Sequence, residues 1–358
     1  MARIDLDLAH AYMRHPKTEE DYALLPLRLT FEDGGAYALL GPSGCGKTTM
    51  LNIISGLITP SQGSVAFDGV DKTTATPQER NIAQVFQFPV VYDTMTVGEN
   101  LAFPLRNRKV SPGQIKERVG QIAEILELNH QLDQRAAGLT ADAKQKISLG
   151  RGLVRADVSA VLFDEPLTVI DPQLKWQLRR KLKQIHHELK LTLIYVTHDQ
   201  IEALTFAEQI MVMSRGKVVQ AGTPEALFER PAHTFVGHFI GSPGMNILPS
   251  SLQEGVLNVA GQMLRVPDGM TVPAGVSRLG IRPEYTRLAR LDQPGAVRAT
   301  VQKVQDIGVC QLLTARVDDH TIRARLGLDE ALPAVGTTVG LVLLDPHTCF
   351  YKDEELIA

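Results

Sequence analysis

The segment GPSGCGKT, residues 41–48, constrains the fold of this chain more than any other stretch. It matches the pattern GxxxxGK[ST], in which glycines let successive backbone amides curl around phosphate oxygens. The pattern acts in this way only between a strand and the first turn of a helix. Here the apolar run AYALL (36–40) precedes it, and TTMLNIISGL (48–57) has a helical pattern that ends at Gly56. The sequence therefore predicts an α/β domain with a phosphate-binding loop.

Later segments continue the alternation of strands and helices. The apolar runs at 64–70, 160–164 and 191–197 predict strands. A helix is expected after Ser111, which can cap its first turn, and another over 173–189, where leucines recur on one face. Apolar strands that alternate with amphipathic helices favour a largely parallel sheet.

The pattern changes at GSPGMNILPSS (241–251), which has the composition of a linker. Short alternating segments follow it, such as AVRATVQKV (296–304) and TVGLVLL (338–344), separated by Gly, Pro and Asp. They predict a small β-rich domain, either a barrel or a sandwich. For 358 residues we therefore expect two domains, 1–240 and 241–358.

The net charge, the cysteine pattern and the length of the apolar runs argue against several classes of protein. The net charge of −3, from 37 basic and 40 acidic residues, gives no sign of a nucleic-acid surface. Cys45, Cys310 and Cys349 form neither a paired framework nor a CxxC motif, which favours a reducing compartment. The first 15 residues do not resemble a signal peptide, and no run approaches the ~18 apolar residues needed to cross a bilayer. Any action at a membrane is therefore expected to need a partner.

Polar residues follow the predicted strands where phosphate chemistry would need them. Lys47 can reach terminal phosphates, and the Thr48 hydroxyl is placed to bind Mg²⁺. Asp164 ends a buried strand and suits the Mg²⁺ shell, while Glu165 could polarise a water molecule as a general base. His198 ends another strand, where an imidazole could contact a γ-phosphate. Considered one at a time, however, Asp164 and Glu165 could simply be solvated acids at the end of a strand, and His198 could be a structural histidine.

The order of the motifs resembles that of the ATPase subunits of ABC transporters. The phosphate loop, Gln87 in VFQFP, the segment 138–153, LFDEP with LTVID, and VTHD follow one another as in that family. LGIRPEY (279–285) is similar to the regulatory domain of MalK-type carbohydrate importers. The resemblance covers nearly the whole chain. It implies an α/β P-loop ABC nucleotide-binding domain with a helical subdomain over 1–240, and a small all-β, OB-like (TOBE) regulatory domain over 241–358.

The resemblance also implies the cofactors, ATP and Mg²⁺, and a role for each site residue. Glu165 would be the catalytic base and His198 would bridge to the γ-phosphate. Adenine would stack on an aromatic residue near the N-terminus, with Tyr12 preferred over its rival Tyr22. The implied nucleotide-binding residues are Tyr12, Gly41, Pro42, Ser43, Gly44, Cys45, Gly46, Lys47, Thr48, Thr49 and Gln87. The implied metal-binding residues are Thr48, Gln87, which would also sense the membrane subunits, and Asp164.

The segment GLTADAKQKISLGRGL (138–153) departs from the family, which has LSGGQ at the start of a helix. Over residues 139–143 only the hydroxyl of Thr140 keeps the signature chemistry. Thr140 should still cap the helix, and Asp142 favours its dipole. A carboxylate ~4 Å from a phosphate charge nevertheless costs about 4 kcal/mol near a protein surface. The charge-assisted hydrogen bond that it displaces would contribute only roughly 1.5–3 kcal/mol. The segment is therefore predicted to be a poor γ-phosphate ligand.

In this family two subunits pair head to tail, so each signature serves the nucleotide on the opposite chain. Asp142 would then impair the partner's site and leave this chain's own loop and Glu165 intact. LTVID departs as well, with Val169 where the family has Asn, although Asp171 is kept. The resemblance thus implies one half of an asymmetric ATPase heterodimer, most similar to the GlpS-type subunit of glycerol importers with two ATPase chains.

The implied partners are a second ATPase subunit with an intact LSGGQ, two transmembrane permease subunits and, indirectly, an extracytoplasmic substrate-binding protein, with no nucleic acid. The chain would sit peripherally on the cytoplasmic face of the inner (plasma) membrane and energise import of a polyol or sugar, with glycerol preferred. The alternative is a soluble ABC ATPase that acts on nucleic acid or ribosomes through an OB-type barrel; the balanced charge and LGIRPEY argue against it. A GTPase is disfavoured because the chain lacks the NKxD motif.

Overall fold

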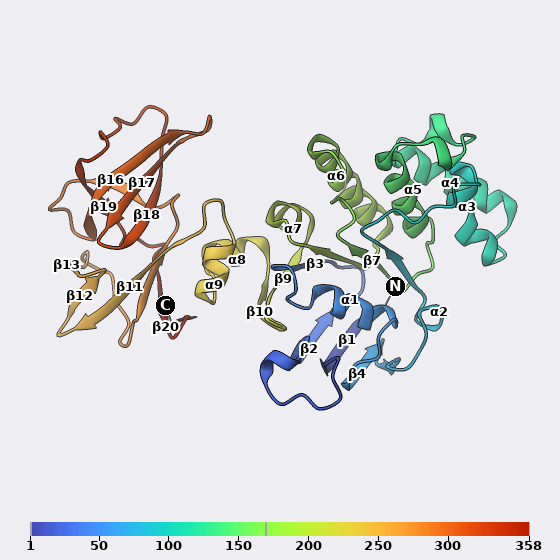
Figure 1. Ribbon diagram of the computed structural model, residues 1–358, viewed down its shortest axis with the longest axis horizontal. Helices are drawn as coiled ribbons and strands as arrows, with labels where there is room; N and C mark the ends of the chain where they lie inside the picture. Colours follow the sequence, from blue (N-terminus) through green and yellow to red (C-terminus); the bar gives the residue numbers. More distant parts are fainter. Residues whose placement is uncertain (1, 169, 358) are drawn as a thin grey trace. The chain divides into compact units, whose positions relative to one another are not determined.

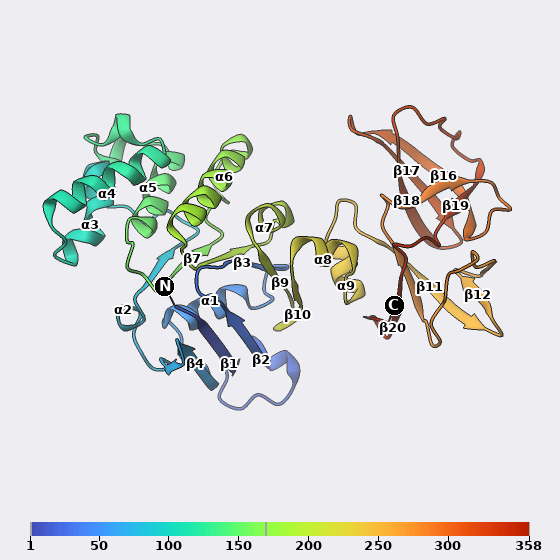
Figure 2. The ribbon, with the colours of Figure 1, turned by 180° about the vertical axis from the view of Figure 1, so that it is seen from behind.

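The computed structural model describes residues 2–168 and 170–357, so Val169 lies outside the described residues. The chain divides into two compact units, Met1–Pro224 and Glu225–Ala358 (Figures 1 and 2). Among the described helices, none combines the length and apolarity that crossing a bilayer requires.

The first unit is built around a six-stranded sheet. Its strand order is β10 (Lys217–Gly222), β9 (Gln209–Ser214), β3 (Ala36–Leu40), β8 (Leu193–Thr197), β7 (Ala160–Asp164) and β6 (Ile82–Val85). Neighbouring strands run parallel from β9 to β6, and β10 is antiparallel to β9. Every residue of β3 and β8 is buried, which is why both appear in the sequence as apolar runs. The largely parallel α/β sheet is confirmed.

A second, antiparallel sheet completes the core of this unit, and the sequence analysis predicted only one of its strands. Its order is β2 (Leu24–Phe31), β1 (Ile4–His10), β4 (Gln62–Phe67) and β5 (Val70–Asp71). Helix α1 (Lys47–Ser55) follows the glycine-rich loop and ends at Gly56, as predicted. Apolar side chains of α1, such as Met50 and Ile53, pack in one cluster with residues of both sheets. The start of α1 is therefore anchored by a core that both sheets share.

The remaining helices of this unit begin at recognisable caps. They are α2 (Pro77–Arg80), α3 (Val97–Asn107), α4 (Pro112–Ile125), α5 (Ala141–Leu153), α6 (Pro172–Leu189) and α7 (Gln200–Phe206). Ser111 caps α4 as predicted, because its hydroxyl accepts from the backbone N–H of Gln114. Helices α3, α4 and α5 group together as the helical subdomain (Figure 1). Gly150 of α5 faces Leu101 of α3 and Leu126, and a Cβ there would lie 2.4 Å from a methyl group of Leu101, so a larger residue would require that leucine to shift.

The second unit is β-rich, as predicted. One sheet has the order β13 (Gln262–Leu264), β12 (Val256–Val259), β11 (Asn246–Gln253), β14 (Arg278–Ile281), β20 (Cys349–Lys352) and β21 (Glu355–Leu356). The other has the order β15 (Arg287–Ala289), β19 (Thr338–Val342), β16 (Ala296–Asp306), β17 (Gln311–Val317) and β18 (His320–Leu326). Leucine, valine and isoleucine side chains from both sheets share one core.

The interpretation of 241–251 as a linker is wrong. Most of that segment belongs to β11, which pairs with β12 and β14. The sequence pattern does not indicate this strand, because two of its inward-facing residues, Asn246 and Ser250, are polar. The amide of Asn246 donates to the backbone oxygen of Arg323 at 2.8 Å and accepts from its N–H at 2.9 Å. These bonds satisfy a buried amide that would otherwise oppose burial.

The unit boundary also lies earlier than the expected division at residue 240. Helices α8 (Pro224–Glu229) and α9 (Thr234–Phe239) are tied to the β-rich unit by Arg282, the arginine of LGIRPEY. Its buried guanidinium donates to the backbone oxygens of Leu227 at 3.3 Å, Phe228 at 2.5 Å and Ile240 at 2.6 Å. It also lies 3.9 Å from the centroid of the Phe228 ring. These contacts are remote in sequence, which is why local patterns placed the boundary too late.

We expect Arg282→Met to loosen the second unit. The substitution keeps the volume but leaves buried carbonyls without donors, at about 1–3 kcal/mol each. Limited proteolysis measures this, since cleavage follows the population of opened molecules. R282M should be cut faster within 225–358, whereas R278M, which alters the half-exposed Arg278–Glu354 pair, should be cut like the wild type. Equal cleavage of R282M and wild type would contradict the role of Arg282.

Candidate functional site

The site lies where three adjacent parallel strands end. Leu40 of β3 lies beside Thr197 of β8, and Asp164 of β7 lies beside Val196. The residues that follow these strands therefore leave the sheet along one edge. The structure thus brings together the glycine-rich loop, Glu165 and His198, as the order of the motifs predicted.

The glycine-rich loop requires its glycines for steric reasons. Gly44 and Gly46 have φ values of 79° and 101°, in the left-handed region that glycine tolerates best. A Cβ on Gly46 would also lie 2.5 Å from the backbone oxygen of Ala23. Lys47 is buried inside the loop, and its ammonium donates to the oxygens of Gly41 at 2.8 Å and Pro42 at 3.0 Å. The loop thus surrounds one positive charge at the N-terminus of α1, an arrangement suited to phosphate.

The hydroxyl of Thr48 donates to the Asp164 carboxylate at 3.2 Å. Burial raises the pKa of the Asp164 carboxyl, and the hydrogen bond from Thr48 opposes that rise. A hydroxyl and a carboxylate at this separation suit Mg²⁺, which prefers oxygen ligands and takes the rest from phosphates and water. Gln87 follows β6 and is half-buried, and no hydrogen bond joins it to Thr48 or Asp164 within the described residues. The structure thus joins Thr48 and Asp164, two of the three expected metal-binding residues, by a hydrogen bond.

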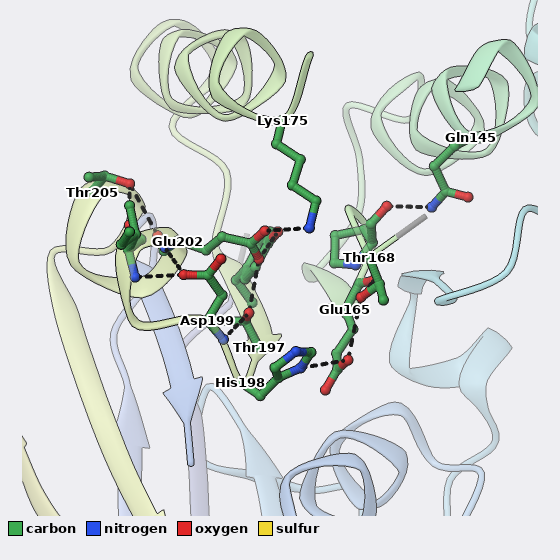
Figure 3. A network of polar contacts seen from close by, with 12 residues as sticks. Gln145, Glu165, Thr168, Lys175, Thr197, His198, Asp199, Glu202 and Thr205 are labelled. Atoms are coloured by element: carbon green, nitrogen blue, oxygen red, sulfur yellow. Dashed lines mark hydrogen bonds and ion pairs between the residues drawn. The ribbon is translucent and has the colours of Figure 1, made fainter. Parts of the chain in front are cut away.

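Glu165 and His198 face each other across the ends of β7 and β8 (Figure 3). Nδ1 of His198 lies 3.0 Å from Oε2 of Glu165. The Glu165 backbone has a φ of 46°, and its N–H donates to the oxygen of Val196 at 3.0 Å, which continues the ladder between the two strands. The hydroxyl of Thr168 donates to the backbone oxygen of Glu165 at 3.1 Å. The backbone of the predicted base is thus held on both sides.

The two tyrosines proposed for adenine differ in their distance from the loop. The Tyr12 hydroxyl lies 3.0 Å from that of Thr49 in α1, and its ring is 70% exposed. The ring of buried His10 meets it edge-on, with the centroids 4.7 Å apart. The Tyr22 hydroxyl accepts from the amide of Gln62 instead, at 3.5 Å. The geometry favours Tyr12 as the aromatic surface beside the loop.

The altered signature segment forms the start of α5, as predicted. The Thr140 hydroxyl accepts from the backbone N–H of Ala143 at 3.3 Å and caps the helix. Asp142 lies in its first turn, with Oδ2 3.6 Å from the ammonium of Lys146 and Oδ1 buried without a hydrogen bond among the described residues. The Lys146 ammonium, one helical turn further on, offsets part of the negative charge of Asp142. Oδ1 of Asp142 still has no donor among residues 2–168 and 170–357.

Sequence analysis missed Gln145, which connects this helix to the site. Gln145 is fully buried in α5, and its amide donates to the backbone oxygen of Pro166 at 2.6 Å, directly after Glu165 (Figure 3). No local pattern marks this glutamine, because the carbonyl that satisfies its buried amide belongs to the segment after β7. Asp171 caps α6 by accepting from the N–H of Gln173 at 2.9 Å.

Comparison with known proteins defines the class. The ABC transporter family model matches residues 24–168, and the TOBE domain model matches residues 279–350. The sn-glycerol-3-phosphate import ATP-binding protein UgpC of Salmonella typhimurium is 39% identical over 338 residues, 92% of this chain and 93% of that protein. The protein of that name from Cereibacter sphaeroides is 42% identical over 290 residues, 81% of each chain. The solved structure of cbiO1 from Clostridium perfringens, part of the ABC transporter complex cbiONQ, has a TM-score of 0.58 at 24% identity and covers 64% of this chain and 90% of that one.

The loop, the parallel sheet and the helical subdomain define a P-loop nucleotide-binding protein. The chain belongs to the family of ABC transporter ATP-binding subunits, and is an ATPase coupled to transmembrane transport. The alternative of an ATPase acting on nucleic acid or ribosomes is not supported, since these relatives are named as import proteins.

We expect Lys47→Ala to abolish tight ATP binding. Hydrogen bonds to a charged group contribute roughly 1.5–3 kcal/mol each, so affinity should fall at least tenfold. Equilibrium dialysis of the full chain with labelled ATP measures this. Lys217→Ala, which alters an exposed lysine paired with Glu19 at 3.0 Å, serves as the control. Unchanged affinity in K47A would show that the loop is not the phosphate site.

Proposed function

We propose that this chain hydrolyses ATP to energise an ABC importer for a polyol, with glycerol as the substrate, and that it forms one half of an asymmetric ATPase pair. One observation carries the ATPase role and the asymmetry, whereas the choice of glycerol rests on the resemblance to glycerol importers. The loop around Lys47 and the Glu165–His198 contact are intact, whereas the signature helix presents Asp142. The partners proposed with it are a second ATPase chain with an intact LSGGQ, two permease subunits and an extracytoplasmic binding protein. The chain is then peripheral, on the cytoplasmic face of the inner membrane.

In this proposal each side chain acts on the bound nucleotide from the edge of the sheet where the structure places it. Lys47 and the backbone N–H groups of residues 43–48 hold the phosphates, and Tyr12 presents its exposed ring to adenine. Thr48 and Asp164 would hold Mg²⁺, which would supply positive charge to offset the negative charge of the phosphates. Gln87 is proposed as a further ligand and as the sensor of the membrane subunits.

Glu165 is the proposed base and His198 its neighbour on the γ-phosphate side. A carboxylate only accepts hydrogen bonds, so Nδ1 of His198 donates to Glu165, and the neutral ring then offers Nε2 as an acceptor. To donate to a phosphate oxygen, the imidazole must take up a second proton or turn away from Glu165. A turning ring would release the Glu165 carboxylate, which could then accept a proton from the attacking water.

The asymmetry follows from pairing two chains head to tail. One site joins this chain's Lys47 and Glu165 to the partner's LSGGQ donors. The other joins the partner's loop to Thr140–Ala143, where a carboxylate replaces small residues. Loss of one preorganised donor typically lowers the rate ~100–1000-fold, so the second site is nearly silent.

Steady-state ATPase activity of the reconstituted complex tests this division. We expect Glu165→Gln to remove most of the turnover, since it inactivates the productive site, while changing the partner's corresponding glutamate removes little. Both variant complexes should bind ATP as tightly as the wild type does. Normal binding would show that the lost turnover comes from the hydrolysis step and not from a failure of the complex to assemble. Equal losses from the two variants, or a dominant loss from the partner's, would contradict the asymmetry.

Uptake decides the substrate, because the permease and the binding protein, rather than this chain, contact it. The relatives above are named for sn-glycerol-3-phosphate, which shares the glycerol backbone. Cells that lack the chain are supplied with wild type or K47A and given labelled glycerol or the phosphate ester separately. Glycerol uptake with wild type alone supports the proposal. Uptake of the ester alone would replace glycerol by the ester and leave the ATPase role intact.

A further inference from the structure

Glu202 is a buried carboxylate behind the candidate site. It lies in the first turn of α7, is 3% exposed, and is held from the neighbouring strand β8 (Figure 3). Its Oε2 accepts from the hydroxyl of Thr197 at 2.9 Å and from that of Tyr195 at 3.1 Å. Burial and the adjacent carboxylate raise the pKa of Tyr195 well above its ordinary value, so this hydroxyl remains a donor. Glu202 therefore receives two hydrogen bonds from residues just before His198.

The Thr197 hydroxyl extends this network to the far side of His198. The hydroxyl donates to Glu202, and its oxygen also accepts from the backbone N–H of Asp199 at 3.0 Å. The Asp199 carboxylate in turn accepts from the N–H groups of Ile201 at 2.8 Å and Glu202 at 3.3 Å, which caps α7. The residues on both sides of His198 are thus tied to Glu202, directly or through one hydroxyl.

His198 needs such a constraint because packing does not supply one. Its side chain is 53% exposed, whereas that of its partner Glu165 is 18% exposed. An exposed imidazole samples several rotamers unless its backbone and its contacts limit them. The 3.0 Å contact with Glu165 therefore depends on where the backbone places the ring.

A second anchor holds Glu202 from the opposite side. Its Oε1 lies 3.7 Å from the ammonium of Lys175 in α6 (Figure 3). Helix α6 begins after the segment that starts at Glu165, so this ion pair connects the two chain segments that carry the predicted base and the histidine. The carboxylate is therefore paired with a charge as well as hydrogen-bonded, as a buried carboxylate requires.

We propose that Glu202 and Thr197 are positioning residues for ATP hydrolysis, which hold the backbone of His198 so that its imidazole meets Glu165. This inference rests on the roles proposed above for His198 and Glu165. It adds two residues that do not touch the nucleotide and act through the histidine.

The test uses the hydroxyl of Thr197 in the reconstituted complex. T197V keeps the shape and removes both hydrogen bonds, and T197S keeps the hydroxyl. T192V is the matched control, since it removes another buried, hydrogen-bonded hydroxyl, which contacts Gly34 and Asp33. We expect T197V to lower kcat about 10–100-fold, as small misplacements of reacting groups do, with the KM for ATP unchanged. The kcat of T197S and of T192V should stay within about twofold of the wild-type value, which corresponds to a change well under about 1 kcal/mol in activation free energy.

A double-mutant cycle with H198A separates positioning from folding. If Thr197 acts through the imidazole, T197V should cost nothing further once H198A has removed it. E202Q, which keeps the acceptor oxygen but loses the charge that pairs with Lys175, should show the same dependence on His198. Additive losses in the H198A background, a raised KM, or equal effects of T197V and T192V would overturn the positioning role alone. Full activity of H198A itself would overturn this inference together with the proposed role of the histidine.

Discussion

The parallel register of β3, β8 and β7 is the constraint on which the rest of the site depends. It places Leu40, Thr197 and Asp164 at one edge of the sheet, so the segments that follow them meet. Successive side chains of a strand point to opposite faces, so a shift of one residue in β8 would turn His198 away from Glu165. The register is held by strands that are buried on both faces, which links the chemistry at the edge directly to the core.

Sequence alone predicted the features that local patterns encode. The glycine-rich loop, the buried run AVLFD and the caps at Ser111 and Thr140 each depend on a few neighbouring residues, and the structure has them where expected. What it could not predict depends on long-range partners. Asn246 makes β11 possible through Arg323, and Arg282 joins α8 and α9 to the second unit. Gln145 and Glu202 were missed for the same reason, because the groups that satisfy them come from other elements.

Two roles are proposed for this chain, hydrolysis of its own nucleotide and contact with the partner's nucleotide, and the positions of charged residues favour only the first. Its own loop surrounds the Lys47 ammonium, and its strand ends carry Asp164 and Glu165, so the site has the charges that MgATP hydrolysis needs. The signature helix instead keeps a hydroxyl cap and carries Asp142, which is only partly offset by Lys146. In the proposed pair, this chain would therefore offer a complete catalytic half to one nucleotide and an impaired half to the other, and such a pair needs only one productive site.

The most direct test of this asymmetry restores the signature in a complex whose normally productive site has been inactivated by E165Q. T140S/A141G/D142G/A143Q is introduced together with E165Q, and ATP hydrolysis of the complex is compared with that of E165Q alone. In the proposed pair the repaired signature would serve the partner's nucleotide, so hydrolysis should rise well above the E165Q level, and that gain should vanish when the partner's glutamate is also changed. If the repaired complex stays as inactive as E165Q alone, Asp142 is not what silences the second site, and the asymmetry proposed for this chain is wrong.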